Sequence, residues 1–277
     1  MLKKILYLLF IAPISLQAQF YYKDLLSLQQ TTELQKTYKA EKIRKVILNS
    51  FDPDDEPTVN FICFQELSPT YNNIKTYTQS VASMQNVLVT QFNPKMQLIR
   101  SADSSTTSLA VTTYSYDAEG KLILVDVSTQ SYAYKQIENE KHVWLYNNAM
   151  QPEQMLRIRN NTDTVMVKFK SNEQNQVIEE QWYNKDGQSI TIYYYFYNEA
   201  KLLTDIVKFN DRAKKLLPET IFEYNASAQV TKMLTVQSGT SNYLVWKYEY
   251  NEKGLKDKES CYNKQKQLQG YLNYRYQ

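Results

Sequence analysis

The stretch YSYDAEGKL, residues 114–122, carries the pattern that decides the fold. Tyr114 and Tyr116 are separated by one residue, so both side chains lie on the same face of an extended strand. Asp117 and Gly120 are typical turn residues, and Leu122 starts the next apolar stretch. These nine residues predict the end of one β-strand, a tight turn and the start of the next strand.

The same unit recurs along the chain. Further copies begin with the aromatic pairs at Trp144, Tyr195, Phe222, Tyr248 and Tyr274, and weaker copies surround Phe92 and Phe169. The second aromatic residue of each good copy is interpreted as a structural anchor of the repeat: Tyr116, Tyr146, Tyr197, Tyr224, Tyr250 and Tyr276. Anchors recur about every 26 residues, which accommodates two strands of about nine residues and two turns of about four.

This repeat predicts a mainly β protein, an antiparallel β-meander of hairpin repeats in a coiled open sheet of about sixteen strands or more. One short N-terminal helix is expected near residues 28–39, because Leu34 and Tyr38 share a helix face and Ser27 with Gln30 fits a capping box. Alternation over residues 43–48 predicts the first strand. The expected domains are a signal peptide (1–18), the helix and first strand (19–60) and the repeat domain (61–277).

The first residues predict export. Lys3 and Lys4 precede an apolar run over residues 5–16, and Ala18 offers a small residue for cleavage. This order is typical of a secretory signal peptide, and the run is too short for a membrane-spanning helix. We expect a periplasmic or extracellular protein that is cleaved after Ala18 and does not span a membrane afterwards.

Composition excludes one class of partner. The formal net charge is +3, and removal of Lys3 and Lys4 leaves about +1, so the chain lacks the basic field that nucleic-acid binding requires. The 24 tyrosines suit a β protein whose surface side chains are partly apolar and partly in contact with water. Cys63 and Cys261 are expected to be free thiols because an elongated repeat would hold them apart, with a disulfide as the alternative.

The unit Tyr116-Asp117-Ala-Glu-Gly120-Lys-Leu122 resembles the tyrosine-aspartate (YD) repeat of Rhs-type bacterial surface and toxin-shell proteins. Residues 183–194 also resemble MORN-variant hairpin repeats. The resemblance covers roughly residues 85–277 and implies an extracytoplasmic β-hairpin scaffold. Two features depart from the family pattern: Ala200 or Ala228 is assigned to the glycine position in other copies, and the arginine that often precedes the tyrosine pair is missing.

Few residues could carry catalysis. His142 is the only histidine, which excludes HExxH zinc chemistry and favours a structural position beside Trp144. Glu179 and Glu180 are adjacent in a predicted strand and point to opposite faces, whereas a dyad of Glu179 with Asp205 remains open. The acidic turn at residues 52–56 could bind Ca²⁺ or simply be solvated. We therefore expect no catalytic residues, no metal site and no cofactor.

The strand around residues 189–197 departs from the repeat. Its second face carries Ile192, Tyr194 and Phe196, where other copies have mostly polar residues. Three explanations remain open: another layer such as the N-terminal helix covers these side chains, they form an exposed patch for a glycan, peptide or protein partner, or the departure is chance variation.

The leading hypothesis is an exported, non-enzymatic repeat protein that acts as a binding or structural module at the cell envelope, with an unknown envelope partner. One alternative is an outer-membrane β-barrel, against which Glu223, Lys247, Glu249 and Arg275 interrupt a face that would have to contact lipid. A second alternative is a glycan-active enzyme that uses carboxylates on the sheet.

Overall fold

The computed structural model describes residues 20–81, 84–210, 214–237 and 240–277. Within these ranges it contains one helix, α1 (Lys23–Ala40), followed by eighteen strands. The strands in chain order are β1 (Lys45–Phe51), β2 (Ile62–Leu67), β3 (Asn73–Ser80), β4 (Met84–Phe92), β5 (Leu98–Ser105), β6 (Ser108–Tyr116), β7 (Leu122–Ser131), β8 (Gln136–Tyr146), β9 (Pro152–Arg159), β10 (Asp163–Ser171), β11 (Val177–Tyr183), β12 (Ser189–Tyr197), β13 (Leu203–Asn210), β14 (Lys215–Tyr224), β15 (Val230–Val236), β16 (Tyr243–Tyr250), β17 (Lys256–Asn263) and β18 (Leu268–Tyr276). The predicted signal peptide lies outside the described residues.

The sheet is closed. Consecutive strands pair in order from β1 to β18, and β1 also pairs with β18. Leu48 of β1 lies opposite Cys63 on one side and opposite Tyr274 on the other. The result is an 18-stranded antiparallel β-barrel, so the predicted open, coiled meander is wrong. The repeat pattern specifies each hairpin but carries no signal for the pairing of β1, which precedes the repeats; closure removes the two unpaired edges of an open sheet.

The chain divides into two compact units. The first comprises residues up to Lys141 together with Tyr250–Lys258 and Gly270–Gln277, and the second comprises His142–Glu249 and Glu259–Gln269. Each unit has its own set of buried side chains and is described by itself.

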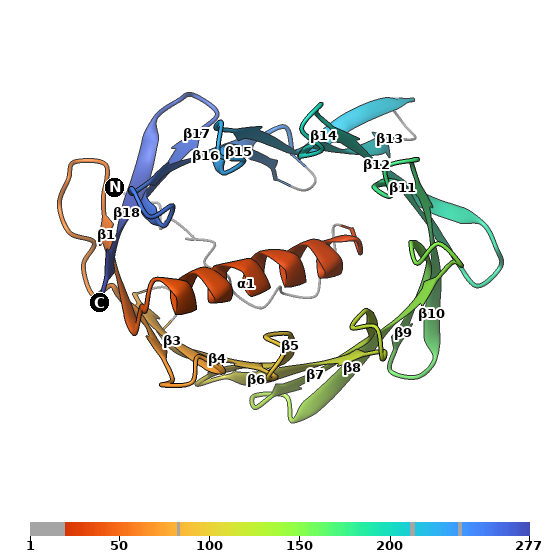
Figure 1. Ribbon diagram of the computed structural model, residues 1–277, viewed down its shortest axis with the longest axis horizontal. Coiled ribbons are helices and arrows are strands. Elements are labelled where there is room, and N and C mark those ends of the chain that lie inside the picture. The colour runs from red at the N-terminus through yellow and green to blue at the C-terminus, as the bar shows by residue number, and fades with distance from the viewer. Residues whose placement is uncertain (1–19, 82–83, 211–213, 238–239) are drawn as a thin grey trace. The chain divides into compact units, whose positions relative to one another are not determined.

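In the first unit, α1 packs against the inner face of the sheet (Figure 1). Tyr38 belongs to one buried cluster with Leu48, Ile74, Leu98 and Leu272, which come from four different strands. These strands present alternate residues to the core, as a two-sided sheet requires. The helix therefore lines the sheet from inside.

The helix begins at Lys23, earlier than predicted, and the capping box at Ser27 is wrong. Tyr22 occupies the N-cap position and makes no side-chain cap hydrogen bond. Buried contacts hold the helix instead: the fully buried Gln35 donates from Nε2 to the carbonyl oxygen of Tyr71 at 2.5 Å. Burial raises the pKa of the Tyr38 phenol, which stays neutral and donates to Gln65 Oε1 at 3.2 Å. Tertiary packing has thus replaced local capping as the source of helix stability.

In the described part of the chain, no helix combines the length and apolar character needed to cross a membrane.

The second unit has an aromatic core. Trp144 and Phe169 stack with ring centroids 5.1 Å apart, and Tyr193 and Trp246 are each 2% exposed. The fully buried Glu180 accepts hydrogen bonds from Tyr195 Oη at 2.6 Å and Trp182 Nε1 at 2.5 Å. A buried carboxylate is tolerable only with such donors. Directly paired residues share a face, so the register from Glu180 to Tyr193 to Lys208 follows this inner face across three strands.

Candidate functional site

The anchor tyrosines bind backbone as well as filling the core. Tyr116, Tyr197, Tyr224 and Tyr276 each stand at the end of a strand and donate to the first carbonyl of the preceding strand, at 2.6–2.8 Å. Tyr197, for example, reaches the carbonyl oxygen of Val177 at 2.8 Å. The side chain therefore ties two strands together where their hairpin begins, which explains why tyrosine rather than phenylalanine recurs at this position.

The polar turns that follow the anchors share one geometry. Asn198 accepts the backbone N–H of Leu202 through Oδ1 at 3.0 Å, and its own N–H donates to the Leu202 carbonyl at 3.0 Å. Lys201, at the fourth position, has a left-handed φ of 63°. Asn172 and Asn225 lead equivalent turns in the second unit. Alternate hairpins of a meander lie at the same end of its strands, so we call the end with the turns of Asn172, Asn198 and Asn225 the Asn-turn edge. The turn led by Asn184 has the same bonds but lies at the opposite end.

The predicted patch exists as a row on one face. Ile192, Tyr194 and Phe196 alternate on β12 with the buried Tyr193 and Tyr195, so they point to the outer face. Phe196 is 48% exposed, while Tyr194 and Ile192 are half-buried by neighbouring outer side chains. Phe196 is therefore not covered, and the interpretation that a helix covers the whole patch is wrong. Whether the patch binds a ligand stays a prediction.

Charged residues on the outer face of the second unit are confined to the half of the wall beside the Asn-turn edge. This charged half carries Lys168, Lys170, Glu179, Asp205, Glu223, Lys232, Lys247 and Glu249. Ion pairs join neighbouring strands here: Lys170 to Glu179 at 2.6 Å and Lys232 to Glu223 at 2.6 Å. Val207, Ile221, Tyr194 and Phe196 are its apolar members.

The other half of the same outer face is apolar. Its members are Met166, Tyr183, Ile190, Ile192, Phe209, Leu216, Leu234, Val236, Tyr243 and Val245. Outward positions of this apolar half include Thr164 and Gln181. Glu219 stands at the irregularity in the pairing of β13 with β14, and apart from it the described outward positions of this half on β10–β16 include no Asp, Glu, Lys or Arg. Ile190 is 46% exposed and Leu216 is 43% exposed. This is an extended surface with little charge on seven adjacent strands.

The inner face of the second unit changes in the opposite direction. Beside the Asn-turn edge it is mostly aromatic and aliphatic, with Trp144, Phe169, Tyr195 and Trp246, and the fully buried Glu180 lies among them. Away from that edge it carries Arg157, Arg159, Asp163, Lys208 and Thr235. Arg157 forms an ion pair with Asp163, and Lys208 Nζ lies 5.4 Å from the centre of the Tyr193 ring. Inner and outer faces therefore exchange polarity along the length of the same strands.

The residues considered for catalysis do not form a site. His142 is buried on the inner face together with Trp144, as its structural interpretation requires. Glu179 and Asp205 point outward on β11 and β13, with β12 between them, and Glu179 is engaged by Lys170. Within the described ranges, no three His, Cys, Asp or Glu residues gather in a way that could hold a metal ion. Cys63 and Cys261 are buried free thiols.

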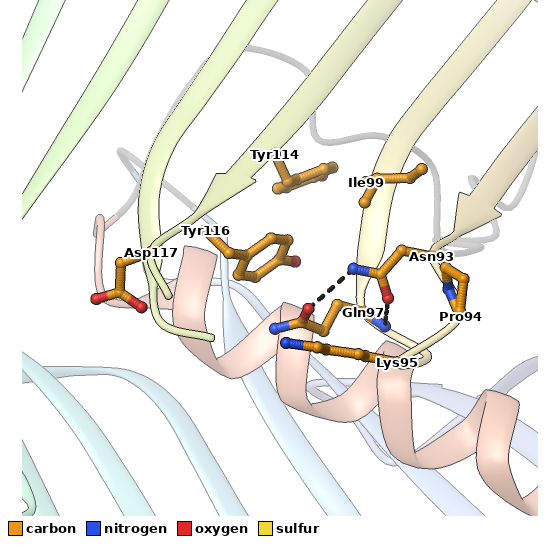
Figure 2. A pocket seen from close by; sticks show the side chains of 8 residues that line it. All are labelled: Asn93, Pro94, Lys95, Gln97, Ile99, Tyr114, Tyr116 and Asp117. Carbon is orange, nitrogen blue, oxygen red and sulfur yellow. Dashed lines mark hydrogen bonds between the residues drawn. The ribbon is translucent and has the colours of Figure 1, made fainter. Parts of the chain in front are cut away.

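A hollow of about 460 Å³ lies in the first unit between two turns (Figure 2). Asn93 and Gln97 face each other across it and bond at 2.9 Å, and Gln97 also donates to the Gly120 carbonyl at 3.0 Å. The Tyr116 hydroxyl donates to Leu98, and Asp117 accepts the N–H of Lys121 at 2.7 Å. Most polar groups here therefore serve the turns themselves, which makes the hollow a weak candidate for a ligand.

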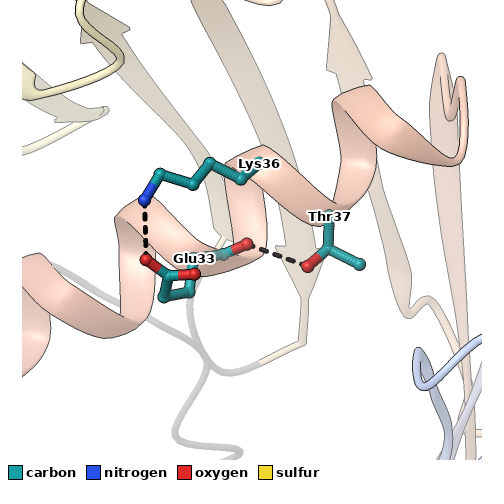
Figure 3. A network of polar contacts seen from close by, with 3 residues as sticks. All are labelled: Glu33, Lys36 and Thr37. Carbon is teal, nitrogen blue, oxygen red and sulfur yellow. Dashed lines mark hydrogen bonds and ion pairs between the residues drawn. The ribbon is translucent and has the colours of Figure 1, made fainter.

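Helix α1 presents a polar surface away from the core. Glu33 and Lys36 form an exposed ion pair at 2.8 Å, and Thr37 donates back to the Glu33 carbonyl at 2.9 Å (Figure 3). Exposed pairs at this spacing contribute little to stability. This face of the helix is therefore polar and exposed.

Sequence reasoning missed two sets of residues. One is the glutamine that ends many turns: Gln97 and Gln176 each reach the next turn along the edge, and Gln176 donates to the Lys201 carbonyl at 3.0 Å. The recurring spacing Asn-x-x-x-Gln is a signal that could have revealed it. The other is the inner charged set with Arg157 and Lys208, which the alternation of charges between the two strand faces could have indicated.

Comparisons with known proteins add no family. No protein-family model matches the chain, and no curated protein matches it. Among solved structures, a porin-like protein from Bacteroides uniformis is 9% identical over 85% of this chain and 96% of that chain, with a TM-score of 0.43. A TcdB2-TccC3-TEV chain is 13% identical over 78% of this chain, with a TM-score of 0.35, and a Photorhabdus luminescens Tc holotoxin pore chain is 11% identical over 87%, also at 0.35. This chain spans only 12% and 17% of those two toxin chains. Scores this low carry no argument, so the resemblance to the YD-repeat family stays a prediction.

Proposed function

We propose that the protein is an exported, non-catalytic β-barrel of the outer membrane. Closure of the sheet carries this proposal: β1 pairs with β18, and the ring of eighteen strands leaves no edge. A bilayer interior offers no water to unpaired backbone groups, so only helices and closed barrels span it. Bacterial outer-membrane barrels are antiparallel with an even number of strands. The proposal replaces the expectation that the mature chain does not span a membrane, because it assigns that role to strands.

The distribution of outer charges supports it further. Glu223, Lys247 and Glu249 argue against lipid contact when they are read from sequence, yet all three lie in the charged half beside the Asn-turn edge. Lysine or arginine facing lipid at the midplane costs about 2–4 kcal/mol per residue. Among the described residues, the outward positions of the apolar half include no lysine or arginine. The proposed lipid-facing surface is therefore the apolar half.

The height of the apolar half limits the thickness of hydrocarbon that it can contact. Outward positions of the apolar half span about five residues, or about 16 Å along a strand, which is less than the roughly 25 Å band of typical outer-membrane barrels. Lys168 and Lys247 at the boundary have long stems that can carry their charges toward water, and bilayers thin around short apolar bands. A short band is thus compatible with insertion at modest cost.

Fractionation tests the proposal. The chain, expressed with its N-terminal residues in a bacterium that has an outer membrane, is expected in the outer-membrane fraction, where only detergent releases it. Recovery in the soluble fraction without detergent would refute insertion.

A second candidate is an exported, water-soluble binding or structural module. Two ion pairs on the outer face favour it, Lys170–Glu179 and Lys232–Glu223. Such pairs are typical of a protein surface that contacts water. In that case Ile192, Tyr194 and Phe196 would be the surface for a glycan, peptide or protein of the envelope. A pull-down from envelope extract, comparing the wild type with Tyr194→Ala/Phe196→Ala, tests this candidate: identical partners for both proteins would remove the patch.

A further inference from the structure

Along the strands of the second unit, the outer and inner faces change polarity in opposite directions. This points to a wall of which only a part is embedded in a bilayer. In the second unit, the charged half of the outer wall stands opposite an aromatic inner face, and the apolar half stands opposite Arg157, Arg159, Asp163 and Lys208. A charged outer face over an aromatic inner face is typical of a water-soluble protein with an apolar core. An apolar outer face over a polar inner face is typical of a barrel wall that contacts hydrocarbon outside and encloses polar groups inside.

Resting on the proposed outer-membrane location, we propose that lipid contacts only the apolar half of the second unit's outer wall, and that the charged half beside the Asn-turn edge projects from the bilayer into water. Charged side chains avoid hydrocarbon unless they can reach the interface. The boundary between the two halves therefore marks the membrane surface.

Hydrocarbon suits the apolar half better than a protein partner does. A partner on the outer wall would place no demand on the inner face of the same strands. A bilayer does, because strands that lie in lipid and face a wet interior must carry their polar side chains inside. Arg157 on β9 and Lys208 on β13 are polar side chains on the inner face of such strands.

The first unit repeats the pattern only in part. Its outer face carries Lys45, Glu66 and Lys75 near one end of the strands and Phe51, Tyr77 and Tyr271 away from it, with Arg275 and Phe64 between them on either side of Ile47. In the middle of the wall it also carries the ion pair of Lys141 with Asp126 at 3.8 Å. Phe51 and Tyr271 stack at 4.9 Å, and Phe64 and Tyr77 stack at 5.2 Å. Its inner face away from the edge carries Ser50, Thr78, Asn86 and Asp103. The outer aromatic stacks suit a membrane interface.

Three strands depart from the trend. Leu145 on β8, Ile178 on β11 and Phe196 on β12 are exposed apolar residues beside the Asn-turn edge. Partial embedding places all three in water rather than lipid. Phe196 is the sharpest single test, because its hydrophobicity alone would assign it to the bilayer.

Depth-dependent labelling of the full chain in lipid vesicles tests the inference. Single cysteines are introduced in pairs on one strand each: Met166→Cys with Lys170→Cys, Ile192→Cys with Phe196→Cys, and Val245→Cys with Glu249→Cys. Each carries an environment-sensitive fluorophore and is probed with a lipid-chain quencher and with aqueous iodide. The unmutated protein, whose Cys63 and Cys261 are buried, gives the labelling background, and circular dichroism confirms the fold of each variant.

At positions 166, 192 and 245 we expect blue-shifted emission and several-fold stronger quenching by the lipid quencher than at their partners. At positions 170, 196 and 249 we expect several-fold stronger quenching by iodide. Lipid quenching at both heights would overturn partial embedding while leaving the outer-membrane location intact. Iodide quenching at both heights would overturn the inference together with that location.

Discussion

At the residue scale, the anchor tyrosines combine two roles that the sequence shows only in part. Their spacing predicts a shared face, and Tyr197 does lie inside, on the face of Tyr193 and Tyr195. The hydrogen bond from its hydroxyl to Val177 depends on where the preceding strand begins, which a local pattern does not state. Local periodicity therefore predicts which residues repeat, and only the paired strands show what their polar atoms bind.

Tyr197→Phe isolates that hydrogen bond. Loss of the donor leaves the Val177 carbonyl without it, and we expect the free energy of unfolding to fall by about 1 kcal/mol. Urea unfolding followed by tryptophan fluorescence measures the change. Tyr194→Phe on the outer face of the same strand is the control, since its hydroxyl bonds to no described residue, and an equal loss in both variants would contradict the role of the anchor.

The turn residue Ala228 stores backbone strain. Its φ is 59°, a left-handed conformation that costs a residue with a Cβ roughly 1 kcal/mol relative to glycine. Ala228→Gly is expected to stabilise the protein by up to about 1 kcal/mol in the same unfolding assay. Ala226→Gly, two residues earlier and outside the left-handed region, should destabilise it slightly because glycine raises the entropy of the unfolded chain. A loss of stability in Ala228→Gly would contradict this account.

At the scale of elements, prediction succeeded for strands and was weaker for the helix. Aromatic pairs and Asn-led turns recur often enough to place the hairpins from β6 to β18. The helix was expected near residues 28–39 but spans Lys23–Ala40, because contacts of Gln35 and Tyr38 with distant strands stabilise it and no cap marks its start. The division of the outer face into a charged half and an apolar half could not be predicted for a related reason. Which half a charged residue belongs to becomes visible only when the strands are aligned by their register.

Gln35→Ala tests how α1 is held. The substitution removes the bond to the Tyr71 carbonyl and leaves a space in a fully buried site. A buried acceptor left unsatisfied costs about 2 kcal/mol, which is a roughly 30-fold change in a local opening equilibrium. Amide hydrogen exchange over the C-terminal half of α1 should accelerate by about that factor. Gln30→Ala on the exposed side of the helix is the matched control, and equal exchange in both variants would show that Gln35 does not hold the helix.

At the scale of the whole molecule, closure depends on a contact between residues more than two hundred positions apart, which repeat periodicity does not encode. An open meander and a barrel share every hairpin and differ only in the pairing of β1 with β18. Strand β1 precedes the repeats and has no aromatic pair, so nothing in the pattern marks it as the partner of the last strand. The same closure turns a repeat scaffold into a candidate membrane barrel.

A cross-link across that seam tests closure directly. Asn49 and Asn273 lie opposite each other on the outer face of β1 and β18, and directly opposed residues place their Cα atoms about 4.5–5.5 Å apart, within the range of a disulfide. Asn49→Cys/Asn273→Cys is expected to oxidise readily and to migrate faster on a non-reducing gel. Asn49→Cys/Ser128→Cys, which joins β1 to β7 across five intervening strands, should stay reduced under the same conditions. Because an open sheet separates its first and last strands, failure of the 49–273 pair to form in the folded protein would reject the barrel, and with it the proposed insertion into the outer membrane.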